Sequence, residues 1–587
     1  MNFHEFYMGK IFDAYKYMGA HLTEDGAVFR TFAPGAVKIA LISDINEWQE
    51  IPMERLAQDG SFWECRVEGA KAGMMYKYRI YDRSGRCVDH CDPYGFGMEL
   101  RPNSASILRD MEFEFTDDVW VAGRDTFLDK PLNIYEVHFG SFRKPEDRAD
   151  AWYNYEEMED ILLPYLKENG YNFLEIMPLN EYPSDESWGY QGTGFFSPTS
   201  RYGSAGQLKK FVNACHANGI GVIMDFVAVH FAVDAYGLAN YDGTPLYEYP
   251  NEAVGDSEWG SKNFMHSRGE VRSFLQSVAN YWIEEFHFDG LRMDAISRAI
   301  YWQGDPNRGV NGNAVDFLKT MNRGLKERHP NVILTAEDST SFPGVTKPVE
   351  QGGLGFDYKW DMGWMNDTLN YFRTDPQYRS QEYHKLTFSM MYYYDEQYLL
   401  PLSHDEVVHG KATILQKMSG DVPVKFPQAR AFYMYMYAHP GKKLNFMGNE
   451  LGQIREWDEK RQQDWHLLED PEHRAFHDFM QGLNRFYLAH PAFYECDEEK
   501  EGFEWLDCHQ EEKCIYAMLR SCPTEKVAAI FNFSDQEWNA YQLEIPGAGN
   551  LKLVYASDAE SGKVQHAEGD VFLFDLKPYS ALYYIVE

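Results

Sequence analysis

The segment FDGLRMDA, residues 288–295, places an arginine and an aspartate two positions apart in a predicted strand. Because strand side chains point to opposite faces with a period of two, Arg292 and Asp294 share one face, opposite Leu291 and Met293. A guanidinium beside a carboxylate keeps it ionised and fixes its orientation, which suits a carboxylate nucleophile. The alternative is an interior salt bridge that only supports the fold, since structural ion pairs are common.

Three more segments, residues 221–230, 331–338 and 399–406, also deliver acids or histidines at the end of an apolar run. Short continuous apolar runs are typical of strands buried on both faces of a parallel sheet. Four unpaired carboxylates would be costly to bury unless they line one solvated site. In a (β/α)8 barrel the carboxyl ends of all strands converge on the face where active sites lie. We therefore predict an α/β fold built on a TIM (β/α)8 barrel, with these polar residues at its rim: Asp225, His230, Glu337, Asp338, His404 and Asp405.

The four segments resemble the four signature regions of the α-amylase family of glycoside hydrolases and transglycosidases. The similarity is closest to the 1,4-α-glucan (glycogen) branching enzymes, and it extends beyond the four motifs. Ala228 and Val229 stand where a Pro-Gly or Pro-Ala pair is usual, and Phe226 where tryptophan is common. These departures concern loop shape rather than the carboxylates. The other segments that carry the resemblance are residues 187–191, 195–203, 353–364, 402–411, 446–453, 456–457 and 464–468.

The resemblance implies a role for each candidate site residue and implies no cofactor. Neighbouring strand positions face opposite ways, so only one of Glu337 and Asp338 can point inward; the resemblance selects Glu337. The two reacting carboxyl groups, on Asp294 and Glu337, should lie about 5–5.5 Å apart, as in retaining enzymes. We expect no metal site, because no loop has the dense oxygen ligands of EF-hand spacing. The implied roles are Asp294 as nucleophile, Glu337 as acid and base, Asp405, His230 and His404 as ligands of sugar hydroxyls, Tyr190 as a stacking platform, and Asp225 as the residue that orients Arg292.

The chain has 587 residues, too many for one core, and its patterning predicts four parts. We expect a lead helix at residues 1–18, a glycogen-binding-type β-sandwich at 19–116, the barrel at 117–490 and a C-terminal β-sandwich at 491–587. For the N-terminal module, packing against the barrel is favoured over glucan binding. The irregular stretch after His230 should shape the substrate groove. The predicted barrel strands are residues 133–139, 173–177, 221–227, 290–294, 332–336, 355–358, 398–402 and 443–447.

The composition limits the classes of binding partner and the cellular compartment that we expect. The formal net charge of -36 repels nucleic acid and anionic membranes, and it suits a neutral polysaccharide such as glycogen, amylose or amylopectin. Eight cysteines without CxxC spacing support neither a zinc site nor a redox motif. We find no signal peptide and no apolar run long enough to span a membrane. We therefore expect a monomeric cytoplasmic protein with reduced thiols.

The resemblance predicts a branching enzyme, which moves a piece of an α-1,4-glucan to a 6-hydroxyl by a retaining double displacement. Hydrolysis, as in an amylase or a debranching enzyme, is the first alternative, because water and a sugar hydroxyl enter at the same place. Residues 353–364 and 407–411 favour transfer by resemblance. The second alternative is an inactive glucan-binding scaffold, which the complete set of carboxylates disfavours.

Overall fold

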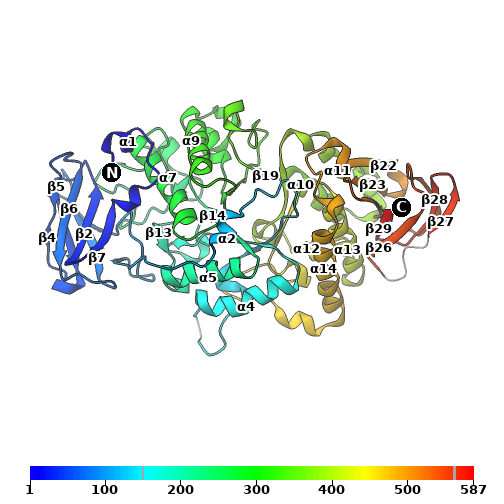
Figure 1. The fold of residues 1–587 in the computed structure, drawn as a ribbon, viewed down its shortest axis with the longest axis horizontal. Coiled ribbons are helices and arrows are strands. Elements are labelled where there is room, and N and C mark those ends of the chain that lie inside the picture. Colours follow the sequence, from blue (N-terminus) through cyan, green and yellow to red (C-terminus); the bar gives the residue numbers. More distant parts are fainter. Residues whose placement is uncertain (149–150, 559–563) are drawn as a thin grey trace. The chain divides into compact units, whose positions relative to one another are not determined.

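The computed structural model describes residues 1–148, 151–558 and 564–587 (Figure 1). The chain divides into two compact units. The first comprises residues 1–125, 138–163 and 175–356, and the second comprises residues 126–137, 164–174 and 357–587. Each unit contributes strands to the barrel.

Eight strands close into a barrel in chain order, which confirms the predicted fold class. The sixth strand begins three residues later than predicted, because Gly355 adopts a left-handed φ of +80° that an extended strand cannot contain. The other seven lie within two residues of their predicted limits, and the strand at residues 398–402 matches them. The strands are β10 (Asn133–Val137), β11 (Phe173–Ile176), β14 (Gly221–Phe226), β17 (Gly290–Met293), β18 (Ile333–Ala336), β19 (Tyr358–Trp360), β20 (Tyr398–Leu402) and β21 (Lys442–Phe446).

Helices alternate with these strands, as the sequence pattern predicts. Helix α7 (Gly269–Glu284) precedes β17, and α9 (Gly312–Arg328) precedes β18. Short helices fill the connections. The longer helices are α4 (Tyr155–Glu168), α5 (Ala205–Ala217), α7 (Gly269–Glu284), α9 (Gly312–Arg328), α10 (Met362–Arg373), α13 (Val422–Ala438) and α14 (Pro471–Ala489). The shorter ones are α1 (Phe3–Tyr7), α2 (Asp118–Ala122), α3 (Phe139–Phe142), α6 (Glu252–Gly255), α8 (Ser297–Ile300), α11 (Lys385–Phe388) and α12 (Ile414–Lys417).

The expected lead helix is much shorter than residues 1–18. It ends at Tyr7, and Gly9 follows with a φ of +67°, which an α-helix cannot accommodate. A single 3-10 turn at Ala14–Lys16 then leads into the first strand. The helical periodicity of this segment reflects packing on α7 instead: the Ser277 hydroxyl accepts a bond from the Ala14 N–H at 3.0 Å.

The N-terminal module is a β-sandwich in the first unit. Its position against the rest of that unit is fixed by buried polar contacts: the Thr31 and Tyr241 hydroxyls lie 2.7 Å apart, and His90 Nδ1 lies 3.0 Å from the Gly237 carbonyl. Packing against the barrel part of this unit is thus observed. One sheet orders β1 (Gly19–Thr23), β2 (Gly26–Phe32), β6 (Phe62–Glu68) and β5 (Glu54–Arg55). The other orders β4 (Ile51–Pro52), β3 (Lys38–Ser43), β7 (Met75–Tyr81) and β8 (Cys87–His90), with β9 (Ser106–Ile107) beside β7.

A second β-sandwich ends the chain, in the second unit. Its core is apolar and fully buried, for example at Ile530, Phe574 and Leu582. Arg520 donates to the Ala438 carbonyl of α13 at 2.7 Å and to Asp497 at 2.6 Å, which joins the sandwich to that helix. One sheet orders β22 (Phe503–Gln510), β23 (Ile515–Ser521), β24 (Lys526–Asn532), β29 (Ser580–Val586) and β26 (Leu551–Ala556). The other orders β25 (Trp538–Glu544), β28 (Val571–Leu576) and β27 (Val564–Glu568).

A buried charged network anchors the amino ends of β14 and β17 in the first unit. His216 on α5 lies 2.6 Å from Asp117 and 2.8 Å from Asp289. Asp289 immediately precedes β17, and it also accepts bonds from the Val222 N–H at 2.8 Å and from Arg124 at 2.9 Å. Burial lowers the pKa of His216, but the bonds and charges of the two aspartates outweigh burial and raise it. The network therefore fixes the register of the strand that carries Arg292.

Two further properties follow from the described residues. All eight cysteines carry free thiols. In the part of the chain that the structure describes, no helix combines the length and the apolar character needed to cross a bilayer.

Candidate active site

Arg292 is the centre of the candidate site in the first unit. Its Nη1 lies 2.6 and 2.8 Å from the two oxygens of Asp225 and 2.9 Å from Asp294 Oδ1, and its Nη2 lies 2.6 Å from Glu337 Oε2. The pairing of β14, β17 and β18 explains this convergence, because Asp225 and Arg292 are register partners. Only 1% of Arg292 is exposed, so its charge is balanced by these three carboxylates rather than by water.

The structure turns Glu337 toward this arginine and Asp338 away from it. Glu337 Oε2 also accepts a 2.9 Å bond from the Ala295 N–H. Asp338 instead closes a local turn, where its Oδ1 accepts bonds from the Thr340 N–H at 2.8 Å and the Thr340 hydroxyl at 2.7 Å. Of the two neighbouring acids, Glu337 is therefore the one whose side chain faces Arg292.

The protonation of Asp294 differs from the expectation that Arg292 holds it ionised. Burial raises the pKa of Asp294, and although Arg292 lowers it, the charges of Glu337 and Asp225 raise it further, to well above its usual range. The expectation was wrong because it counted one cation and left out two nearby anions and the burial.

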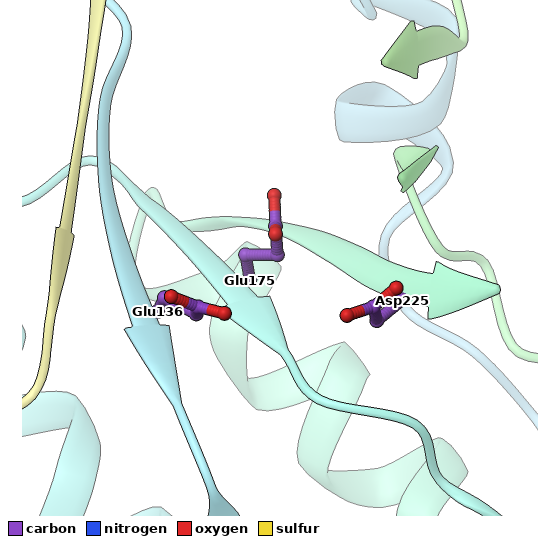
Figure 2. Close-up of side chains that lie close together, drawn as sticks. All are labelled: Glu136, Glu175 and Asp225. Carbon is purple, nitrogen blue, oxygen red and sulfur yellow. The ribbon is translucent and has the colours of Figure 1, made fainter. Parts of the chain in front are cut away.

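Barrel strands in both units carry buried acids. Asp225 is fully buried at the end of β14, and Tyr190 donates to its Oδ2 at 2.5 Å. Figure 2 shows Asp225 on β14 and two further buried acids, Glu175 on β11 and Glu136 on β10. Sequence reasoning missed Glu136 and Glu175; the available signal was one acid inside each apolar strand. Carboxylates of this kind are candidates for binding a cation. Asp225 is already neutralised by Arg292, so its ion pairing is satisfied without a metal.

His230 occupies the two-residue strand β15 (His230–Phe231), which pairs with β16 (Lys262–Asn263). It is 3% exposed, and burial lowers its pKa to about 4, so the imidazole is neutral at pH 7. The Ser261 hydroxyl lies 2.9 Å from Nδ1 and holds the ring in place. A neutral ring held at one nitrogen can exchange a hydrogen bond with a sugar hydroxyl at the other.

His404 and Asp405 follow β20 in the second unit. Glu136 on β10 accepts a 2.9 Å bond from the His404 N–H and lies 2.5 Å from its Nδ1. Both residues are buried, so the acid fixes the orientation of the imidazole. Asp405 lies in the 3-10 turn His404–Val407, whose path is held by a 2.7 Å bond from Lys411 Nζ to the Asp405 carbonyl. Glu136 is thus a positioning residue for His404.

Comparison with known proteins identifies the family. The family model described as "Alpha amylase, catalytic domain" matches residues 161–240 and 259–526. The 1,4-alpha-glucan branching enzyme GlgB of Fusobacterium nucleatum is 44% identical over 548 residues, covering 92% of this chain and 88% of that protein. The chain belongs to the α-amylase family, among the 1,4-alpha-glucan branching enzymes. The branching enzyme GlgB of Bacillus caldolyticus is 42% identical over 577 residues, covering 96% of this chain and 86% of that protein.

Family models also match both ends of the branching-enzyme chain. Residues 17–95 match carbohydrate-binding module 48 (isoamylase N-terminal domain), and residues 505–587 match the α-amylase C-terminal all-beta domain. Among solved structures, a pullulanase from Anoxybacillus in complex with maltotetraose aligns over 99% of this chain and 89% of its own, with a TM-score of 0.75 at 16% identity. A putative α-amylase from Salmonella typhimurium aligns over 97% of this chain and all of its own, with a TM-score of 0.75 at 18% identity. At these identities the structural likeness supports the fold alone.

Proposed function

We propose that the protein cleaves α-1,4-glucan chains and transfers the released segment to a 6-hydroxyl, forming α-1,6 branches. The observation that carries this proposal is the single buried arginine that contacts Asp225, Asp294 and Glu337. This arrangement brings a candidate nucleophile and a candidate proton donor together beside one guanidinium. The relatives of the chain are named branching enzymes. The substrate class is a neutral α-glucan such as glycogen, amylose or amylopectin, which suits the net charge of -36.

In the first step Asp294 attacks the anomeric carbon while Glu337 gives a proton to the leaving glycosidic oxygen, so that the C–O bond breaks and a glycosyl ester forms. In the second step Glu337 takes the proton of the incoming 6-hydroxyl, whose oxygen displaces Asp294 and restores the α configuration. Inverting enzymes need about 6.5–9.5 Å between the two carboxyls to admit water. Both carboxyls contact the same guanidinium, Asp294 at 2.9 Å and Glu337 at 2.6 Å, which supports the shorter, retaining separation.

The other candidate residues hold the sugar. We assign Asp405, His404 and His230 to sugar hydroxyls, and Tyr190 to the sugar face. The strands of a closed parallel barrel present their carboxyl ends to one rim, which supports grouping the residues that follow β14, β17, β18 and β20. Bonds to the hydroxyls of a distorted sugar strengthen in the transition state and so raise kcat.

Hydrolysis is the competing function, because the same carboxylates serve water. The test incubates the protein with linear amylose and counts reducing ends before and after an α-1,6-specific debranching enzyme is added. Transfer predicts that new ends appear only after debranching, whereas hydrolysis predicts that they rise from the start. Asp294→Ala and Glu337→Gln should each lose several orders of magnitude in rate while remaining folded, and near-normal branching by either variant would exclude these roles.

The proposal also covers assembly, compartment and domain limits. We propose a monomer in a reducing cytoplasm, supported by eight free thiols, of which five are buried: Cys65, Cys91, Cys215, Cys496 and Cys514. The proposed parts remain residues 1–18, 19–116, 117–490 and 491–587. Sedimentation at several protein concentrations tests the monomer.

A further inference from the structure

Trp259 is a large aromatic side chain held open to solvent beside the candidate site. It is 42% exposed, and it lies at the tip of a tight turn between α6 and β16. The turn is closed by the Ser257 N–H, which donates to the Ser261 carbonyl at 2.9 Å, and by their two hydroxyls, 2.5 Å apart. Gly260 takes a φ of +74°, the left-handed conformation that such a turn requires.

Three contacts connect this turn to site residues of the first unit. Ser261 at its base lies 2.9 Å from His230 Nδ1, and the Trp259 ring centroid lies 5.1 Å from that of His230. The Trp259 carbonyl accepts a 3.0 Å bond from Gln191, the neighbour of Tyr190. The guanidinium of Arg298, four residues after Asp294, lies 5.1 Å from the same ring centroid. Arg298 also pairs with Glu258, the residue before the tryptophan.

These contacts fix an aromatic ring that the protein itself does not cover. Single exposed apolar residues are ordinary on protein surfaces. Here, however, the turn, the carbonyl and the ring are each restrained. The restraining residues are the candidate site residue His230, the sequence neighbour of Tyr190, and Arg298, four residues after Asp294. Rigid rings fixed in this way bind ligands at little entropic cost, since few rotamers are lost. The apolar face of a sugar is a fitting partner, because tryptophan offers a wide apolar surface with a polar edge.

We propose that Trp259 packs against a glucose unit of the glucan chain next to the reacting sugar, and that this contact sets the affinity for the chain. The inference rests on the proposed function and names a further substrate-binding residue for it. A contact of this kind forms equally in the ground state and the transition state. It therefore acts on KM and leaves kcat nearly unchanged.

The test compares Trp259→Ala and Trp259→Phe with a matched control, Phe388→Ala. Phe388 is a 56% exposed aromatic residue on α11 in the other unit and has no part in the proposed site. Branching kinetics on amylose give kcat and KM for the full chain. Calorimetric titration of maltoheptaose into an Asp294→Asn background gives Kd without turnover, so binding is read independently of catalysis.

We expect Trp259→Ala to raise both KM and Kd about tenfold, as the loss of roughly half of a buried ring's contact predicts, with kcat within about twofold. Trp259→Phe should recover most of the affinity, and Phe388→Ala should match the unsubstituted protein. An unchanged Kd in Trp259→Ala would overturn the inference. So would a fall in kcat that accompanies a lower melting temperature, since the turn would then serve only to hold His230.

The proposed function and the role of Trp259 can be refuted independently. If the unsubstituted protein neither binds nor branches amylose, the proposed function is wrong and the inference falls with it. If the unsubstituted protein branches amylose and Trp259→Ala binds maltoheptaose equally well, only the role of Trp259 is wrong.

Discussion

Replacing Asp225 by asparagine tests whether this buried acid acts on catalysis through Arg292. The carboxylate accepts contacts of 2.6 and 2.8 Å from Arg292 and a 2.5 Å bond from Tyr190, and it is fully buried. Asparagine has nearly the same shape but only one acceptor oxygen. Its NH2 group would face a donor group of Arg292 or Tyr190, with which it cannot form a hydrogen bond. At least one charge-assisted bond is therefore lost.

The size of the effect follows from those contacts. A hydrogen bond to a charged group contributes about 1.5–3 kcal/mol, and up to two such contacts are disturbed. Arg292 keeps Asp294 and Glu337 as partners, so it is not left as an unpaired buried charge. We therefore expect a total loss of about 3–4 kcal/mol of transition-state stabilisation, which corresponds to a fall in kcat/KM of roughly 100- to 1000-fold. Stability should fall less, by about 1–2 kcal/mol.

The assay is the initial rate of amylose branching, paired with urea unfolding of the same variant. The matched control is Asp92→Asn in the N-terminal module, where a fully buried carboxylate accepts bonds from Tyr76 at 2.7 Å and Tyr78 at 3.1 Å. This control should lose comparable stability and keep its activity. If Asp225→Asn lost stability but retained more than half its activity, the argument that Asp225 positions Arg292 would be refuted.

Two further predictions concern buried networks. Glu136→Gln should lower kcat roughly 10- to 100-fold in the branching assay, because the neutral amide no longer fixes the imidazole of His404 through a charged bond; wild-type kinetics would contradict its positioning role. Because the pKa of His216 is raised in the folded state, its contribution to stability is complete below about pH 6.5 and is lost as the pH rises through the folded-state pKa. The pKa values of Asp117 and Asp289 are lowered by their hydrogen bonds and neighbouring charges despite burial. Their contribution is therefore present above about pH 3.9 and is lost as the pH falls through the folded-state pKa values. Urea unfolding from pH 4 to 9 should therefore show the largest difference between the unsubstituted protein and His216→Asn at acidic to neutral pH, and a pH-independent difference would exclude this role.

The barrel could be predicted because its strands are continuous apolar runs, a pattern that buried parallel strands impose on a sequence. The errors fall where a local conformation overrides the pattern. The helical periodicity of residues 6–18 is real, but Gly9 ends the helix with a positive φ. At the sixth strand, Gly355 delays the extended conformation until Tyr358. Periodicity reports which face is buried and gives no information on such single-residue dihedral angles.

The site was predictable to the extent that strand ends carry charged residues. Asp225, Arg292, Asp294 and Glu337 were found because each interrupts or ends an apolar run. Glu136 lies inside such a run, and its significance depends on a partner, His404, that is 268 residues away. Trp259 lies in an irregular stretch, where no periodicity relates the position of a residue in the sequence to the direction of its side chain. Two features of the site could therefore not be predicted from one sequence: side-chain pairs between residues far apart in the chain, and the geometry of loops.

Arg292 has a second role beyond geometry, because it contacts both reacting carboxyls. Catalysis requires the proton on Glu337 and the charge on Asp294, whereas burial and two neighbouring anions raise the pKa of Asp294 before substrate binds. Arg292 contacts Asp294 through Nη1 and Glu337 through Nη2, so whichever carboxyl is ionised faces a guanidinium nitrogen. A change in which carboxyl carries the proton therefore leaves no unpaired buried charge. A lysine at this position could not maintain both contacts, since its single ammonium lacks the planar fork.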